Sequence, residues 1–101
     1  MNTKLAYCHV VASVLAADGV IEDAERQFLD RIMNDMNLSE SERDQVIHFE
    51  GTDGAVETVR ELPALAREQL RDDVLAATLV DGKISPHESR MVSLITDALG
   101  L

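Results

Sequence analysis

Two copies of one acidic motif contain the residues best suited to chemistry in this sequence. The segment "ADGVIEDAE" occupies residues 17–25 and "VDGKISPHE" occupies residues 80–88, and both contain the pattern Asp-Gly-x-Ile-x-x-x-Glu. The acidic residues that the copies share are Asp18, Glu25, Asp81 and Glu88. Carboxylate oxygens are preferred ligands of hard cations, so the motif is a candidate site for a divalent cation such as Ca²⁺ or Mg²⁺.

The motif is not a standard calcium-binding EF-hand loop. Aligned on that loop, Asp18 takes the fifth position and Glu25 the last. Calcium takes about six to eight oxygen ligands, and each copy of the motif supplies two carboxylates. The first and third ligand positions fall on residues without a side-chain oxygen, which are Val14 and Ala16 in the first copy and Ala77 and Leu79 in the second.

A structural role explains most of the motif without a metal. The glycine permits a left-handed backbone where a helix ends, and the isoleucine attaches the turn to the core. The glutamate falls at the third position of the following helix, where it can accept the N–H of the N-cap residue. These residues are Gly19, Ile21 and Glu25 in the first copy and Gly82, Ile84 and Glu88 in the second.

The aspartates are harder to explain by structure alone. Asp18 and Asp81 fall at the carboxyl end of a helix, where an uncompensated carboxylate costs about 0.3–1 kcal/mol. Backbone amides of the turn, an arginine such as Arg26 or Arg90, or a bound cation could compensate. The sequence leaves these three alternatives open.

The other reactive residue types form no catalytic arrangement. The three histidines are too scattered for zinc spacing, and the single cysteine, Cys8, is expected to be a small core residue. No hydroxyl residue has an evident base, and no glycine-rich phosphate loop is present. We therefore expect no enzyme activity and no catalytic residues.

The net charge of -10 restricts the partners. It opposes binding to nucleic acid and to anionic membranes, and it is compatible with cations or with a basic protein partner. No segment is long and apolar enough to insert into a membrane. The N-terminal segment resembles a secretory signal, but His9 interrupts it and the same pattern recurs at residues 70–80, so we interpret it as a structural helix and expect a cytoplasmic protein.

Apolar periodicity predicts six helices and no strand. The first covers 3–17, with Leu5, Cys8, Val11, Ala12 and Leu15 on one face, and the second covers 23–36, with Ala24, Phe28, Ile32 and Met36 on one stripe. A capping box of Ser39 and Glu42 begins the third, which Gly51 ends. The others are a short helix capped by Thr52 with Val56, Val59 and Leu62; a long one from Pro63 to Gly82 that contains Leu65, Leu70, Val74, Leu75, Thr78 and Leu79; and one capped by Ser85, with Pro86 in its first turn, that reaches Leu99.

An internal repeat organises these helices. At an offset of 63 residues, the segment from Asp18 aligns with the segment from Asp81, with identities that include Ile32 with Ile95 and Leu38 with Leu101. The sequence therefore predicts an all-α fold, a compact bundle of about six helices in which two similar hairpins are related by pseudo-twofold symmetry. We expect residues 1–101 to form a single domain.

The two motifs, the approach "REQLRDDVLAATLVDGKISPHE" and the closing "ITDALGL" resemble the TerB-like family, which includes bacterial tellurite-resistance TerB and the N-terminal region of DjlA co-chaperones. The resemblance covers both hairpins, whereas residues 39–62 are less characteristic. It implies an all-helical fold with two similar halves, a link to metal stress and to protein complexes at the inner face of the membrane, and metal binding by Asp18, Glu25, Asp81 and Glu88. Ser85 and Pro86 replace Glu22 and Asp23 of the first copy, so the copies are not equivalent.

Two functions follow as hypotheses. The first is a small TerB-like module that acts through protein contacts in a bacterial stress response of the metal or tellurite type, with divalent-cation binding by the duplicated motif. The alternative is a dedicated sensor or buffer of Ca²⁺ or Mg²⁺ without a tellurite role. The sequence does not name the protein partner or the oligomeric state, since a fold does not fix a function.

Overall fold

The computed structural model describes residues 2–16, 21–48, 54–80 and 86–100, apart from the side chains of 86–88 and 91, and all regular structure in these ranges is helical. The helices are α1 (Thr3–Leu15), α2 (Asp23–Asp35), α3 (Glu40–Ile47), α4 (Ala55–Val59), α5 (Ala64–Thr78) and α6 (Pro86–Ala98). The radius of gyration is 12.2 Å, close to the value of about 13 Å for a compact chain of this length. The prediction of an all-α bundle of six helices is confirmed.

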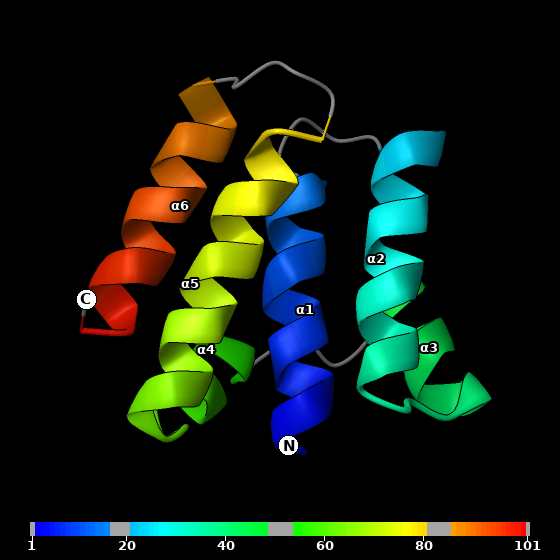
Figure 1. Cartoon of the computed structure of the whole chain (residues 1–101), viewed down its shortest axis with the longest axis horizontal. Helices are drawn as coiled ribbons and strands as arrows, with labels where there is room; N and C mark the ends of the chain where they lie inside the picture. The colour runs from blue at the N-terminus through cyan, green and yellow to red at the C-terminus, as the bar shows by residue number, and fades with distance from the viewer. Residues whose placement is uncertain (1, 17–20, 49–53, 81–85, 101) are drawn as a thin grey trace.

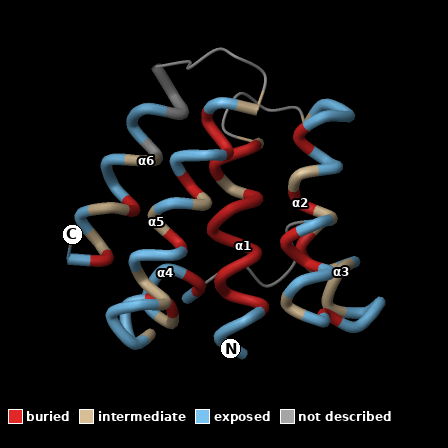
Figure 2. Tube along the Cα trace, viewed as in Figure 1, coloured by how far each residue is buried: buried red, intermediate tan, exposed pale blue. Residues whose placement is uncertain are grey.

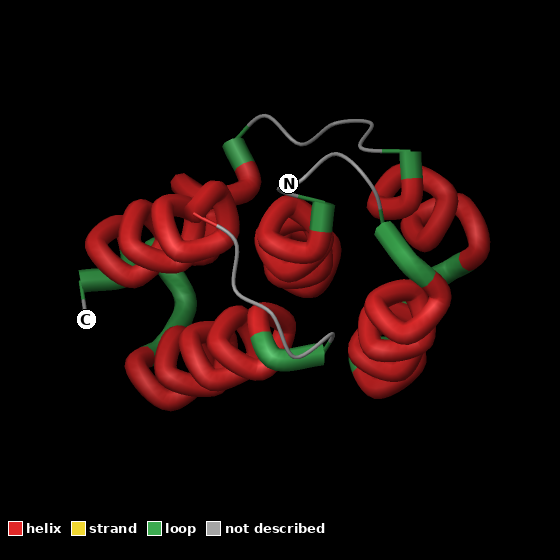
Figure 3. The backbone as a smooth tube through the Cα atoms, turned by 90° about the horizontal axis from the view of Figure 1, so that it is seen from above, coloured by secondary structure: helices red, strands yellow, loops and turns green. Residues whose placement is uncertain are grey.

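Helix α1 lies at the centre of the bundle and packs against each of the other five helices (Figures 1 and 3). Its buried residues run from 5 to 12 without a break and continue with Val14 and Leu15 (Figure 2). A helix that is buried around its whole circumference carries apolar residues on all sides. The face of α1 predicted from the sequence is therefore buried, and so are most of the residues that lie between the predicted positions.

Helix α5 is buried on one face only, because it packs mainly against α1 and α6. Its buried residues are Leu70, Val74, Ala77 and Thr78. The other three leucines in the predicted segment are exposed, Leu65 by 81%, Leu75 by 44% and Leu79 by 64%. Leucines are frequent here, but this helix has too few neighbours to cover them all.

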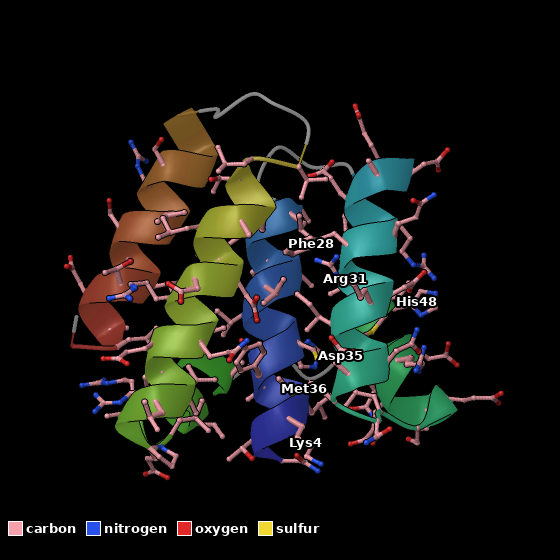
Figure 4. All side chains as sticks on the ribbon, viewed as in Figure 1. Lys4, Phe28, Arg31, Asp35, Met36 and His48 are labelled. Atoms are coloured by element: carbon pink, nitrogen blue, oxygen red, sulfur yellow. The ribbon has the colours of Figure 1, made fainter. Side chains whose placement is uncertain are left out.

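The predicted stripe of α2 is wrong by about one residue. The buried residues of α2 are Glu25, Leu29, Ile32 and Met33, so only Ile32 of the predicted stripe is fully buried. Ala24 is exposed, and Phe28 and Met36 are half-buried at the edge of the core. The Phe28 ring instead lies 5.5 Å from the guanidinium carbon of Arg31 in a cation–π contact (Figure 4).

The helix ends reproduce the sequence repeat. Adding 63 to the bounds of α2 gives the bounds of α6, and adding 63 to the last residue of α1 gives the last residue of α5. Helix α1 packs on α2, and α5 packs on α6. The repeat in the sequence is therefore a repeat of helical hairpins.

The repeat also includes the residue that terminates the second helix of each hairpin. Asn37 after α2 and Gly100 after α6 are 63 residues apart, and both have a left-handed backbone, with φ of 57° and 74°. After α2, the N–H of Asn37 donates to Asn34 O and that of Leu38 to Met33 O, a complete Schellman motif. After α6, Gly100 donates to Asp97 O in the equivalent position. Asparagine tolerates this conformation better than other side chains, a signal that the sequence contained for the end of α2.

The central connection differs from the prediction. The capping box at Ser39 and Glu42 is confirmed, with both reciprocal hydrogen bonds present. Helix α4 begins at Ala55 after Gly54, which has a φ of 83°, and ends at Val59, short of Leu62. The predicted residues Gly51 and Thr52 lie outside the described part of the chain. Pro63, predicted to lie in the first turn of its helix, is instead the N-cap of α5, directly before that turn. Pro86 is the first residue of α6, as predicted.

Candidate functional site

Glu25 is the one motif carboxylate whose side chain the structure describes. It is the third residue of α2, and only 3% of its surface is exposed. Its Oε1 accepts a hydrogen bond of 3.1 Å from the N–H of Glu22, the N-cap residue. The predicted capping role of Glu25 is therefore confirmed, because the carboxylate satisfies an N–H that the helix cannot pair internally.

Glu88 occupies the same position in the second hairpin. It is the third residue of α6, which fits the predicted capping box, although its side chain is outside the described set. Asp18 and Asp81 also lie outside the described residues, as do Gly19 and Gly82. The convergence of the four predicted ligands, Asp18, Glu25, Asp81 and Glu88, therefore stays a prediction.

The described side chains do not by themselves form a metal centre. Among them, no three or more His, Cys, Asp or Glu groups lie close enough to hold an ion. Oε1 of Glu25 accepts the N-cap hydrogen bond of α2, so a cation would compete with the helix cap for this carboxylate. A cation site would depend on the two aspartates.

One of the arginines that the sequence offers as a counter-charge has a partner of its own. The Nε of Arg26 lies 3.2 Å from Asp30 Oδ1, one turn further along α2, and both side chains are nearly half exposed. An exposed pair at this spacing contributes little to stability, about 0.3–0.5 kcal/mol. Arg26 therefore remains able to turn toward another carboxylate at small cost.

Two polar groups inside the bundle were not predicted from the sequence. The hydroxyl of Tyr7 on α1 donates a hydrogen bond to Asp73 on α5. Burial, and then this hydrogen bond and the negative charge of Asp73, raise the pKa of the Tyr7 phenol far above its ordinary value, so it stays protonated. One feature of the sequence indicated this pair. At the repeat offset of 63 residues, Asp73 aligns with the apolar residue Val10.

The second unpredicted group is His9, whose side chain is fully buried. Neither of its ring nitrogens has a hydrogen-bond partner in the described structure. Burial lowers the pKa of its imidazole, so the ring is neutral. Neighbouring Cys8 is buried as predicted, and burial raises the pKa of its thiol to about 12, so it is not a ready nucleophile.

Together these features define the class of protein. It is a duplicated all-helical bundle in which an acidic Asp-Gly-x-Ile-x-x-x-Glu segment ends in the first turn of the second helix of each hairpin. No helix in its described part is long and apolar enough to cross a membrane. The chain belongs to the TerB family, described as tellurite resistance protein TerB, whose model matches residues 4–101. The predicted family is thereby confirmed, and the match includes the less characteristic segment 39–62. Neither a curated protein nor a solved structure matches the chain significantly.

Proposed function

We propose that this chain is a small acidic TerB-family module that acts through protein contacts in a bacterial stress response of the metal or tellurite type. The observation that carries the proposal is the family match over nearly the whole chain, together with the equivalent placement of Glu25 and Glu88 in α2 and α6. The module would work in the cytoplasm, as a single domain and without a catalytic step. Its charge of -10 favours a basic protein partner or a membrane-associated complex over nucleic acid.

We also propose that the duplicated motif binds a divalent cation, Ca²⁺ or Mg²⁺, through Asp18 and Asp81 with Glu25 and Glu88. The support is that capping explains the glutamates but not the aspartates, which recur at the same place in both hairpins. The aspartates would then decide whether an ion binds, and the glutamates would chiefly hold the ends of α2 and α6.

Thermal unfolding in millimolar Ca²⁺ or Mg²⁺ tests the cation site. The unmodified chain is expected to gain about 2.7 kcal/mol when the cation concentration is about 100 times its dissociation constant. Changing both Asp18→Asn and Asp81→Asn should abolish the gain. The matched control changes Asp35→Asn and Asp97→Asn, which are exposed aspartates on α2 and α6 and alter the charge equally. No gain in the unmodified chain, or an equal loss in the control, would refute the cation site.

The stress-response role has a separate test. A strain lacking the gene should grow more poorly in tellurite or in excess divalent metal, and the unmodified chain should restore growth. If growth is restored by the variant with Asp18→Asn and Asp81→Asn, the chain acts through protein contacts alone. If deletion changes growth in neither condition, the stress-response role is wrong, and cation binding without it would favour a sensor or buffer.

A further inference from the structure

An open apolar pocket lies at the end of the bundle where α1 begins. It has a volume of about 380 Å³ and is formed where α1, the last turn of α2 and the first turns of α5 meet. In Figure 4, Lys4 lies at the lower end of α1 and Met36 at the lower end of α2, on the same end of the molecule. The lining residues are Thr3, Lys4, Tyr7, Met36, Leu62, Leu65, Ala66 and Gln69.

The pocket has an exposed apolar rim and an anchored floor. Leu65, on the α5 side, is 81% exposed, so a partner that covered it would remove apolar surface from water. Tyr7 is only 3% exposed and is held by its hydrogen bond to Asp73. Tyrosine is enriched among the residues that carry most of the binding energy of protein interfaces, and the exposed surface of Leu65 adds apolar area that a partner can bury.

Carboxylates lie beside the pocket. Asp73 on α5 accepts the hydrogen bond from Tyr7 at the floor, and Asp72 is its exposed neighbour in the same helix. Asp35 is next to Met36 on the other side (Figure 4). In the described structure the only ion pair of these three is that of Asp72 with Arg71, at 3.4 Å between exposed side chains. Lys4 is the one charged residue of the lining itself, so the three carboxylates border the pocket and do not line it.

We propose that this pocket docks an amphipathic helix of a protein partner, with leucine-like side chains inserted beside Leu65 and Tyr7 and with lysines or arginines facing Asp35, Asp72 and Asp73. The inference rests on the proposed role of the chain as a protein-interaction module. Charge complementarity selects a basic helix over an acidic one and over an anionic lipid surface. The accessible surface of the lining is mainly apolar, which selects apolar side chains over a polar small molecule.

A designed peptide tests the chemistry of the pocket. The probe is a helix of about 18 residues, about five turns, built from leucine on one face and from lysine and alanine on the other. A second peptide has glutamate in place of lysine. Fluorescence anisotropy should show binding of the lysine peptide and not of the glutamate peptide, and the affinity should fall as salt is raised. Equal binding of both peptides would overturn the proposal.

Two leucine variants locate the binding. Leu65→Asp should weaken binding of the lysine peptide by at least about tenfold, the effect of losing one anchoring residue. The control is Leu94→Asp on α6, since Leu94 is 58% exposed and is not part of the pocket. Both positions are exposed, so neither variant should unfold the chain. Equal effects of the two variants, or none from Leu65→Asp, would overturn the proposal.

The oligomeric state separates a partner helix from a second copy of the chain. Analytical ultracentrifugation should give the same mass for the unmodified chain and for Leu65→Asp. A dimer that Leu65→Asp dissociates would overturn the proposal, because the pocket would then be a self-interface. If a partner is captured from cells and Leu65→Asp retains it, the inference about the pocket fails while the role in protein contacts stands.

Discussion

Helices α1 and α5 are the first helices of two hairpins that share a sequence repeat, yet they lie in different environments. Helix α1 is surrounded by five helices and is buried nearly throughout, whereas α5 has two main neighbours and presents three leucines to solvent. When the two repeats are aligned at the offset of 63 residues, Val11 matches Val74, and both side chains are fully buried. Burial at this position is therefore common to the two helices, whereas burial at other aligned positions differs.

The divergence is clearest one turn before those valines. Three buried residues of α1 align with charged residues of α5: Cys8 with Arg71, His9 with Asp72, and Val10 with Asp73. Duplication of a hairpin gives two similar helices, but only one can occupy the centre of a small bundle. The second must have a polar outer face, and the leucines left on that face become available for contacts with other molecules.

The comparison predicts unequal costs for the same truncation in the two helices. Leu15→Ala in α1 should lower the free energy of unfolding by about 2–5 kcal/mol, because Leu15 is fully buried. Leu79→Ala at the C-cap of α5 should change it by less than about 0.5 kcal/mol, because Leu79 is mostly exposed. Urea denaturation of both variants measures the difference. Similar costs would show that α1 is not the more central helix.

This contrast was only partly predictable from the sequence. Helix positions and the caps at Ser39 and Glu25 follow from local rules of spacing and hydrogen bonding, and they were predicted. The number of helices around α1 depends on how distant segments pack, so the exposure of Leu65 and Leu79 was not predicted from the sequence. The aligned stretches Cys8–Val10 and Arg71–Asp73 contained a signal for this difference in burial. Only the second stretch consists of charged residues, so only that helix must have a solvent-exposed side.

The candidate cation site shows the same limit. The position of Glu25 in its helix is a local property, and the sequence was sufficient to predict its hydrogen bond to Glu22. Whether Asp18 and Asp81 approach each other depends on the relative placement of two hairpins, which no local pattern specifies. The hydrogen bond between buried Tyr7 and half-buried Asp73 likewise joins residues from separate helices.

The hydrogen bond between Tyr7 and Asp73 offers a second test of the comparison, because it is a polar contact between α1 and α5. Tyr7→Phe should cost about 1–3 kcal/mol, as a buried hydroxyl is lost and Asp73 loses its partner. A double-mutant cycle with Asp73→Ala should give a coupling energy of about 0.5–3 kcal/mol. The matched cycle with Asp72→Ala should couple by no more than about 0.3–0.5 kcal/mol, because Asp72 makes no hydrogen bond to Tyr7. Equal coupling in the two cycles would contradict a specific contact.

His9 provides a pH-dependent test of the same difference in burial. Its repeat partner, Asp72, is exposed and charged, whereas His9 is buried, without a hydrogen-bond partner in the described structure, and has a lowered pKa. As the pH falls through the unfolded value of about 6.5, the unfolded chain binds a proton that the folded chain does not. The stability that neutral His9 provides is thus present above that pH and is lost below it, down to the folded pKa, by at most about 1.4 kcal/mol per pH unit.

Urea denaturation at pH 7.5, 6.5 and 5.5 measures this loss. His9→Leu should flatten the slope between these values, because the buried site no longer titrates. His48→Gln is the control, since His48 is exposed on the end of α3 and its removal should leave the slope unchanged. The remaining histidine, His87, is present in every variant, so its contribution cancels. A slope that survives His9→Leu but disappears with His48→Gln would contradict the prediction that His9 is the acid-sensitive group.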